Sequence, residues 1–362
     1  MGGEHNVCCS RLFPFLVHFR FRLCHSPAGI KSAAESAFQI SRWARPLVRT
    51  LSFFSVLLFA LGLTAQSPND LLAAGRADQA VETLDQQIRT TPTAEAYNLL
   101  CRARFELENW DGGIPACELA VAKAPENGLY HLWLGRIYGE KADRAGFLKA
   151  AGLAGKVRVE FERAVELAPS SWEGRSDLAE FYLEAPAIVG GGKDKARAQA
   201  ELLMPLNPAI AHWVKARIAE KSKDNAAAEQ EYRAAIAASQ GGARAWLNLA
   251  GFYRHAARFD EMEQALGTME SRPLDSPAAL VDGASILLRA GRGYPMAVRL
   301  LRRYIESSNT VEEAPVFKAD FLLGEVLEKQ GDRTAAAVEY RAALALAHSY
   351  RQAQDGLRRV TP

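Results

Sequence analysis

The feature that most constrains the fold of this chain is an internal repeat that begins at residue 68. Helical patterns rich in Ala, Leu and Tyr alternate there with turns marked by Pro, Gly, Asn and Asp, and no segment offers a convincing strand-like alternation. Similar phrases end the units, at Ala120–Pro125 (AVAKAP), Ala164–Pro169 (AVELAP), Ala234–Ser239 (AAIAAS) and Ala342–Ala347 (AALALA). This repetition predicts stacked helix hairpins, because one hairpin cannot bury its apolar face alone.

The spacing inside each unit resembles that of the tetratricopeptide repeat, a helix–turn–helix unit of about 34 residues. Small residues at fixed positions let neighbouring helices approach closely, and larger residues fill the remaining space. The pattern is followed by units that start at Ala94, Gly128, Trp172, Ala243 and Phe317, and more weakly near Pro208 and over Ala279–Ile305. In the first unit it is carried by Tyr97, Leu100, Cys101, Gly113, Cys117, Ala120 and Pro125. The resemblance covers residues 68–360.

The resemblance implies an all-α fold, a right-handed α-solenoid of about seven helix hairpins within residues 66–362, capped by a C-terminal helix over Tyr350–Val360. It also implies an exported, non-enzymatic scaffold or adaptor that binds a protein or peptide partner on its concave surface, without a cofactor. In the family this surface is lined by residues of the first helix of each unit. Here these include Asn98, Arg102, Phe105, Arg136, Glu180, Trp213, Arg217, Arg254 and Glu325.

Two adjacent units are longer than the repeat. Pro125 and Pro169 are 44 residues apart, and Pro169 and Pro208 are 39 apart. The extra residues fall near 139–156 and 183–195, which predicts two neighbouring loops on one edge of the solenoid. The two segments carry an apolar cluster and six basic residues, among them Arg144, Lys149, Lys193 and Lys195. This composition predicts a site for an acidic peptide segment or an anionic envelope polymer; a pair of solvated loops is the alternative.

The N-terminal region has the layout of an export signal. Leu51–Ala65 is an uncharged apolar run of 15 residues that follows Arg45 and Arg49, and a membrane-spanning helix needs about 20. Residues 47–65 are therefore predicted to be a signal peptide, and cleavage near Ala65 would leave a periplasmic or otherwise extracytoplasmic chain. An uncleaved anchor in the inner membrane is the alternative, and would make the chain a membrane-tethered envelope assembly factor. Residues 1–46 contain no repeat, and we interpret them as an extension translated from upstream of the true start codon; an unusually long signal region or a cytosolic tail is the alternative.

The remaining chain offers little chemistry for an enzyme. Beyond residue 65 it has 37 Lys and Arg against 40 Asp and Glu, so no general attraction for nucleic acid is expected. No spacing of a metal site, catalytic nucleophile or dinucleotide site is present. Acid pairs such as Glu312 with Glu313, or Asp177 with Glu180, are interpreted as solvated helix faces. We predict no enzymatic activity and no metal; an accessory domain for an envelope enzyme is a further alternative.

Two cysteines, Cys101 and Cys117, follow the predicted cleavage site and lie on facing helices of one hairpin. The position of Cys101 is expected to pack against Gly113, which leaves Cys117 about one turn too far along the second helix. A disulfide requires Cα atoms about 4.4–6.8 Å apart. Two buried free thiols are therefore predicted in preference to a bond.

Overall fold

Consecutive helices pair into hairpins throughout the part of the chain that the computed structural model describes, residues 66–361. A short pair, α1 (Pro68–Ala73) and α2 (Ala77–Thr90), comes first. The hairpins that follow are α3 (Ala94–Glu106) with α4 (Trp110–Lys123), α5 (Gly128–Asp143) with α6 (Phe147–Leu167), α7 (Trp172–Glu184) with α8 (Lys193–Leu203), α9 (Pro208–Lys221) with α10 (Asn225–Ala238), α11 (Ala243–His255) with α12 (Phe259–Ser271), α13 (Ala278–Ala290) with α14 (Tyr294–Ile305), and α15 (Val316–Lys329) with α16 (Arg333–Leu346). The last helix, α17 (Arg351–Val360), packs on α15 and α16. The predicted all-α solenoid of about seven hairpins with a capping helix is confirmed.

The predicted extension, residues 1–46, and the predicted signal segment, 47–65, lie outside the described residues. Within the described part, no helix combines the length and the apolar character needed to cross a bilayer.

Helix starts in this fold follow the polar residues of the turns. The side chains of Thr93, Asn207 and Asp332 each accept a hydrogen bond from the backbone N–H three residues on, at 3.1, 3.2 and 2.9 Å. Such caps satisfy N–H groups that have no partner within the helix. The turn residues of the sequence therefore set where these three helices begin.

Small residues at the helix contacts set the spacing of the stack. A Cβ atom on Gly135 would lie 2.4 Å from Cδ1 of Phe161, and one on Gly324 would lie 2.6 Å from Cε1 of Tyr340. Phe161 and Tyr340 are themselves fully buried. The aromatic rings of the second helices therefore pack directly onto the backbone of the first helices, as the repeat pattern requires.

The prediction of a loop at 139–156 is wrong for most of that range. Helix α5 continues to Asp143, only residues 144–146 connect it to α6, and α6 is 21 residues long. Ala150, Ala154 and Val157 are buried on α6, so the added residues extend the apolar stripe and remain helical. At 183–195 the chain forms the short 3₁₀ helix η2 (Ala187–Val189) and then enters α8. Helix α6 contacts η2, so the two lengthened units are neighbours as predicted.

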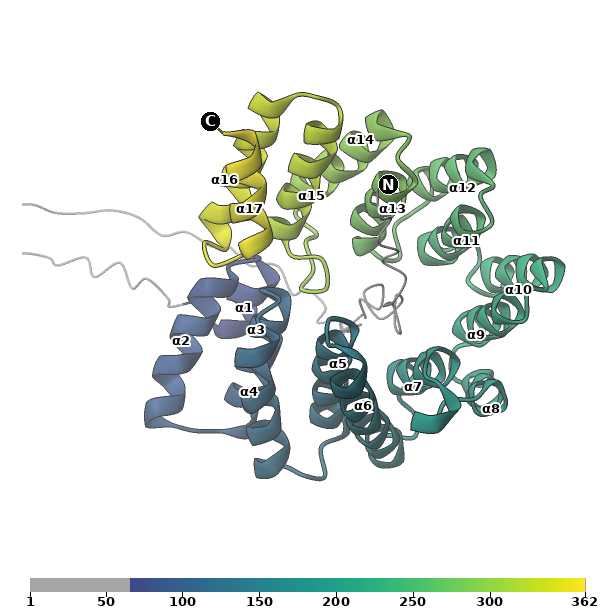
Figure 1. Ribbon diagram of the computed structural model, residues 1–362, viewed down its shortest axis with the longest axis horizontal. Coiled ribbons are helices and arrows are strands. Elements are labelled where there is room, and N and C mark those ends of the chain that lie inside the picture. The colour runs from purple at the N-terminus through teal and green to yellow at the C-terminus, as the bar shows by residue number, and fades with distance from the viewer. Residues whose placement is uncertain (1–65, 362) are drawn as a thin grey trace, which may run out of the picture. The chain divides into compact units, whose positions relative to one another are not determined.

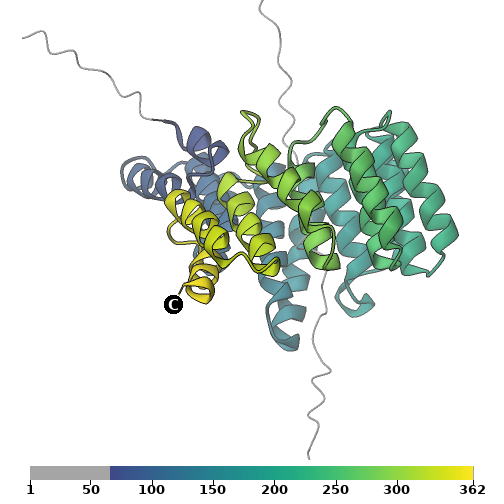
Figure 2. The ribbon, with the colours of Figure 1, turned by 90° about the horizontal axis from the view of Figure 1, so that it is seen from above.

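The first and last helices of the described unit lie side by side. Figure 1 shows α15, α16 and α17 next to α1 and α3, and the turned view in Figure 2 agrees. The hydroxyl of Thr310 donates to the carbonyl of Ala73 at 3.3 Å, and the backbone N–H of Ser349 donates to Asp78 at 3.0 Å. The solenoid therefore curves until its last repeats contact its first.

Candidate functional site

The inner helices of the solenoid surround a cavity of about 610 Å³. It is lined mainly by α7, α9, α11, α13 and α15, which are the first helices of their hairpins. Its apolar wall contains Trp172, Ile210, Trp213, Leu247, Ile286 and Phe321, its cations are Arg144, Arg217, Arg244, Arg254, Arg289 and Lys318, and its acids are Glu108, Glu180, Asp275, Asp282 and Glu325. This central cavity has the size and the mixed lining of a ligand pocket.

A buried ionic network forms one side of the central cavity. The guanidinium of Arg217 on α9 lies 2.9 Å from Glu180, 3.0 Å from Glu184 and 3.2 Å from Glu220. Lys221 also contacts Glu184, at 2.6 Å. Arg217 and Glu180 are both buried, and burial raises the pKa of Glu180 although the charge of Arg217 opposes the rise. The charges of this network pair with one another and hold α7 against α9, although Oε2 of Glu180 is buried without a hydrogen-bond partner among the described residues.

Arg254 on α11 lies at the end of that network. Its Nη2 is 2.6 Å from Nε2 of His255, and Nδ1 of His255 is 3.2 Å from Glu220. These distances fit a neutral imidazole that donates to Glu220 and accepts from Arg254. The Nε–H of Arg254 is buried without a hydrogen-bond partner among the described residues, and burial lowers the pKa of the group. This unmet donor suits a ligand carboxylate, because charge-assisted bonds to Arg are strong.

The inner face of α3 is covered by the chain itself. Nε of Arg102 donates to Glu312 at 2.8 Å, a second bond joins Nη2 of Arg102 to the same carboxylate, and Nζ of Lys318 donates to Glu106 at 2.7 Å. We name this surface the closure face; it consists of Asn98, Arg102 and Glu106 on α3 together with residues 310–318. The prediction that Asn98 and Arg102 line an open groove is therefore wrong.

Several acidic residues that are predicted from the sequence to lie on solvated helix faces are buried. Glu312 pairs with Arg102, and Asp177 and Glu180 are each only 3% exposed. Nε of Arg136 donates to Asp177 at 2.7 Å, and burial raises the pKa of Asp177 to about 6 against the opposing charge of Arg136. The interpretation is wrong because α7, which carries Asp177 and Glu180, faces the inside of a tightly curved solenoid, and because the connection that carries Glu312 packs on α3. The long connection between α14 and α15, residues 306–315, is the sequence signal that marks Glu312 as unusual.

The four basic residues predicted to lie together on one edge of the solenoid, Arg144, Lys149, Lys193 and Lys195, are in different environments; we call them the predicted basic edge. Arg144 lines the central cavity, stacks 4.0 Å from the ring centre of Trp110 and contacts Glu140 at 3.0 Å. Lys193 donates to the carbonyl of Lys221 at 3.1 Å, and Lys195 donates to that of Gly190 at 2.9 Å. Lys149 is exposed on α6. Only Arg144 of these four joins the predicted groove residues Trp213 and Arg254 around the cavity.

Two carboxyl groups next to Arg144 hold protons near neutral pH. Burial raises the pKa of Glu140 to about 7, although the charge of Arg144 opposes the rise. Burial together with the charge of Glu140 raises the pKa of Asp143 to about 8. Neither oxygen of Asp143 has a hydrogen-bond partner within the described residues, which favours the neutral form. In the same part of the chain, no three His, Cys, Asp or Glu residues are grouped so as to hold a metal ion.

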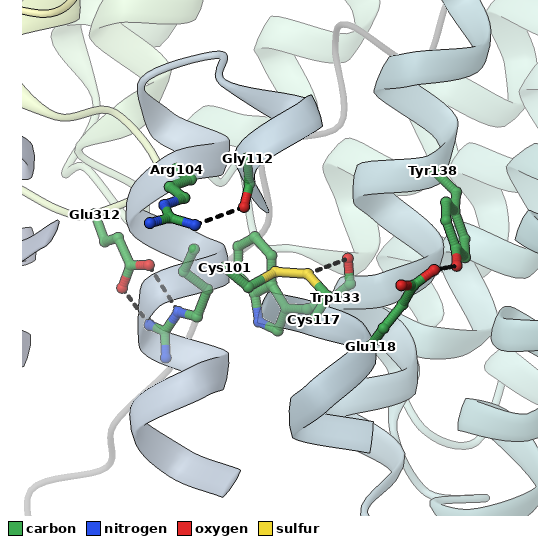
Figure 3. The surroundings of a disulfide bond; sticks show 9 residues. Cys101, Arg104, Gly112, Cys117, Glu118, Trp133, Tyr138 and Glu312 are labelled. Atoms are coloured by element: carbon green, nitrogen blue, oxygen red, sulfur yellow. Dashed lines mark hydrogen bonds and ion pairs between the residues drawn. A yellow bond between two sulfur atoms is a disulfide. The ribbon is translucent and has the colours of Figure 1, made fainter. Parts of the chain in front are cut away.

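The prediction of two free thiols is contradicted by the structure. Cys101 of α3 and Cys117 of α4 have Cα atoms 5.1 Å apart and are joined by a disulfide, which Figure 3 shows beside Trp133. Gly113 lies near Cys101 as expected, since a Cβ atom on it would be 3.6 Å from the carbonyl oxygen of Cys101. The expectation for Cys117 is wrong, because it faces Cys101 across the α3–α4 hairpin with a Cα separation inside the range that a disulfide requires.

Comparison with known proteins gives the following similarities. A family model described as tetratricopeptide repeat matches residues 69–128 and 281–353. No curated protein matches the sequence. Among solved structures, a thermophilic TPR protein from Thermus thermophilus is 16% identical, with 56% of this chain and 97% of that chain covered and a TM-score of 0.41. A tetratricopeptide repeat protein from Parabacteroides merdae is 14% identical, with 77% and 99% covered and a TM-score of 0.37.

A chain of the APC/C hetero-tetramer Cut9–Hcn1 is 15% identical, with 82% of the present chain covered and a TM-score of 0.36. The present chain spans 54% of the length of that chain.

Proposed function

Because the chain belongs to the tetratricopeptide-repeat family, we propose that it is a scaffold that holds an extended segment of a partner protein in its central cavity. Solenoid repeats of this kind present concave binding surfaces, and the family consists in general of non-enzymatic scaffolds. The proposal extends this non-enzymatic role to the present chain, with neither a cofactor nor nucleic acid among its ligands.

The observation that carries the proposal is the cavity of about 610 Å³ with Arg254 at its wall. Arg217 has three carboxylate partners and Arg144 has two, Glu140 and Glu108, whereas the contact of Arg254 is the neutral His255. A partner carboxylate at Arg254 would supply the missing acceptor while apolar side chains pack against Trp213 and Leu247. The expected ligand is thus a segment with an acidic side chain or C-terminal carboxylate next to apolar residues.

A peptide-display selection on the immobilised full chain tests the proposal. We expect the selected peptides to share an acidic group beside apolar residues and to bind Arg254→Met at least about tenfold more weakly, a change that corresponds to about 1.4 kcal/mol. Arg233→Met is the matched control, because Arg233 lies on α10 with a side chain 60% exposed and outside the cavity lining. Equal binding by the Arg254 variant and the parent would overturn the proposed site.

We also propose that the chain is exported and works as a scaffold outside the cytoplasm. The disulfide between Cys101 and Cys117 supports this, since stable disulfides form mainly in oxidising compartments. Cell fractionation with N-terminal sequencing tests it, and a soluble product that begins near residue 66 is expected. A product retained in carbonate-washed membranes would favour the tethered assembly factor, and a cytoplasmic product would contradict both.

A further inference from the structure

The connection between α14 and α15 lies on the inner face of α3. Glu312 of this connection accepts two hydrogen bonds from Arg102, and Lys318, in the first turn of α15, donates to Glu106. Thr310 reaches further along the surface, to the carbonyl of Ala73 at the end of α1. Residues 310–318 thus lie on the N-terminal repeats in the manner of a bound peptide, although they are more than 200 residues away in the sequence.

The charges on the closure face are buried and need partners of opposite sign. The side chains of Lys318 and Glu106 are 7% and 4% exposed, and those of Arg102 and Glu312 are 9% and 14% exposed. Lys and Glu are rarely buried this fully unless they are paired, because desolvation of a lone charge costs several kcal/mol. The inner face of α3 therefore requires one carboxylate and one cation from whatever segment covers it.

The covering segment is held in its bound shape by the side chain of Tyr304 on α14. The hydroxyl of Tyr304 accepts from the N–H of Val311 at 3.0 Å and donates to the carbonyl of Ala314 at 2.5 Å. Val311 and Ala314 also form an isolated antiparallel bridge. A turn fixed in this way loses little conformational entropy when it docks, as expected for a preorganised ligand.

One polar group of the closure face is left over. The side-chain nitrogen of Asn98, one turn before Arg102 on α3, is buried without a hydrogen-bond partner in the described part of the chain, and the residue is 2% exposed. Unpaired buried donors are costly, so a better-matched segment would place a carbonyl oxygen there. The residues 310–318 therefore meet the charges of α3 but leave part of its hydrogen-bonding capacity unused.

From these contacts we propose that the inner face of α3 is a second peptide-binding site, occupied by residues 310–318 of the same chain. Its ligand in trans is a segment of another protein that carries an acidic side chain for Arg102 and, about six residues later, a basic side chain for Glu106. Arg102 and Glu106 lie outside the lining of the central cavity, whereas Lys318 belongs to both surfaces, and the inference goes beyond the proposed function. The chain's own segment competes with such a ligand because it belongs to the same molecule and already lies on α3.

A labelled synthetic peptide with the sequence of residues 308–319 (SNTVEEAPVFKA) tests the proposal by fluorescence anisotropy on the full chain. In the variant Glu312→Gln with Lys318→Gln, the internal segment loses both charges and its hold on α3 weakens. We expect the peptide to bind this variant at least about tenfold more tightly than it binds the parent. Glu306→Gln is the matched control in the same connection, since Glu306 is exposed, and should bind as the parent does.

A second peptide with its acidic and basic positions exchanged should not bind, and adding Arg102→Gln to the double variant should abolish binding of the first peptide. If the double variant does not fold, the single variant Glu312→Gln serves in its place, with an expected gain of at least about threefold. Equal affinity for parent and variant, or equal binding of the exchanged peptide, would overturn the inference. Because neither measurement involves Arg254, failure of the cavity site would leave this result unchanged.

Discussion

The closure face and Arg254 at the wall of the central cavity belong to the same concave surface, but their charged groups differ in the partners that they have within the chain. On the closure face, Arg102 and Glu106 are each paired with a residue that lies more than 200 positions later in the chain. Around the cavity, Arg254 has a neutral imidazole as its contact and a buried N–H without an acceptor in residues 66–361. Charged residues on the inner helices therefore stabilise the fold on the closure face, whereas Arg254 at the cavity wall is available to a ligand.

The largest difference between the two regions is expected when one charge of each is removed. Lys318→Met leaves the carboxylate of Glu106 buried without its cation and should lower the free energy of unfolding by about 3–5 kcal/mol. Arg254→Met removes a half-buried cation whose contact is a neutral imidazole and should change it by about 1 kcal/mol or less. Urea unfolding of both variants measures the contrast. If the double variant Glu106→Gln with Lys318→Met recovers most of the lost free energy of unfolding, the Lys318–Glu106 pair is responsible for the loss. Equal losses of stability in Lys318→Met and Arg254→Met would contradict the proposed difference between the two regions.

Reduction of the disulfide should affect only the closure end of the solenoid. Cys101 and Cys117 are 16 residues apart, and a crosslink over such a loop contributes about 3 kcal/mol. Because contacts in a solenoid are local, amide hydrogen exchange should become faster in α3 and α4 and stay unchanged in α9 to α13. Uniformly faster exchange after reduction would mean that the two regions unfold as one unit.

Alanine substitutions at two glycines of the inner helices should give a smaller difference in stability. In Gly135→Ala the new Cβ would lie 2.4 Å from Phe161, so overpacking should cost about 1–3 kcal/mol. Gly251 faces the central cavity, and a Cβ there would lie 4.0 Å from Ile286. Gly251→Ala should be neutral or stabilising by up to about 1 kcal/mol, since Ala favours a helix more than Gly does. Thermal unfolding of both variants checks this, and a destabilised Gly251 variant would show that the cavity wall is closely packed.

Stability should also depend on pH through the carboxyls beside Arg144. The pKa of Glu140 rises from 4.5 to about 7 on folding and that of Asp143 from 3.8 to about 8. Between the pKa values of the unfolded state and those of the folded state, the folded chain binds more protons than the unfolded chain. The free energy of unfolding therefore falls as pH rises from about 4 to about 8. The decrease should be at least about 1 kcal/mol, because one pKa unit corresponds to about 1.4 kcal/mol. Glu140→Gln with Asp143→Asn should flatten the profile measured by urea unfolding, and an unchanged slope would contradict the assignment.

The smallest effect on stability is expected at the predicted basic edge. Replacing Lys149, Lys193 and Lys195 with Ala removes two hydrogen bonds to backbone carbonyls and should cost about 1 kcal/mol. Binding at this edge stays a prediction, and the comparison with Arg254→Met decides it. If the peptides selected on the parent lose more affinity in the lysine variant, and the loss is greatest at low salt, the ligand lies at the edge rather than in the cavity.

The repeat pattern was sufficient to predict the fold because the helix caps and packing contacts behind it form within a single repeat. Turn residues such as Thr93 and Asp332 cap helices next to them, and Gly135 meets Phe161 within one hairpin. The predicted loop at 139–156 failed because residues of α6 such as Ala150 and Ala154 continue the apolar stripe of the helix, so repeat length alone misplaced the added residues. The disulfide was missed because spacing along the sequence does not give the distance between Cys101 and Cys117, which depends on how α3 packs on α4.

The sequence by itself determined the helices, their pairing and the residues that point to the inner surface, because capping, small-residue contacts and apolar periodicity act over one repeat. The tertiary structure decided which inner residues remain open to a ligand. The small rotation between successive hairpins adds up over the whole array until α15 meets α3, and no single repeat encodes that sum. This accumulated curvature turned Arg102 and Glu106 into partners of Glu312 and Lys318, while it left Arg254 and Trp213 at the wall of a cavity.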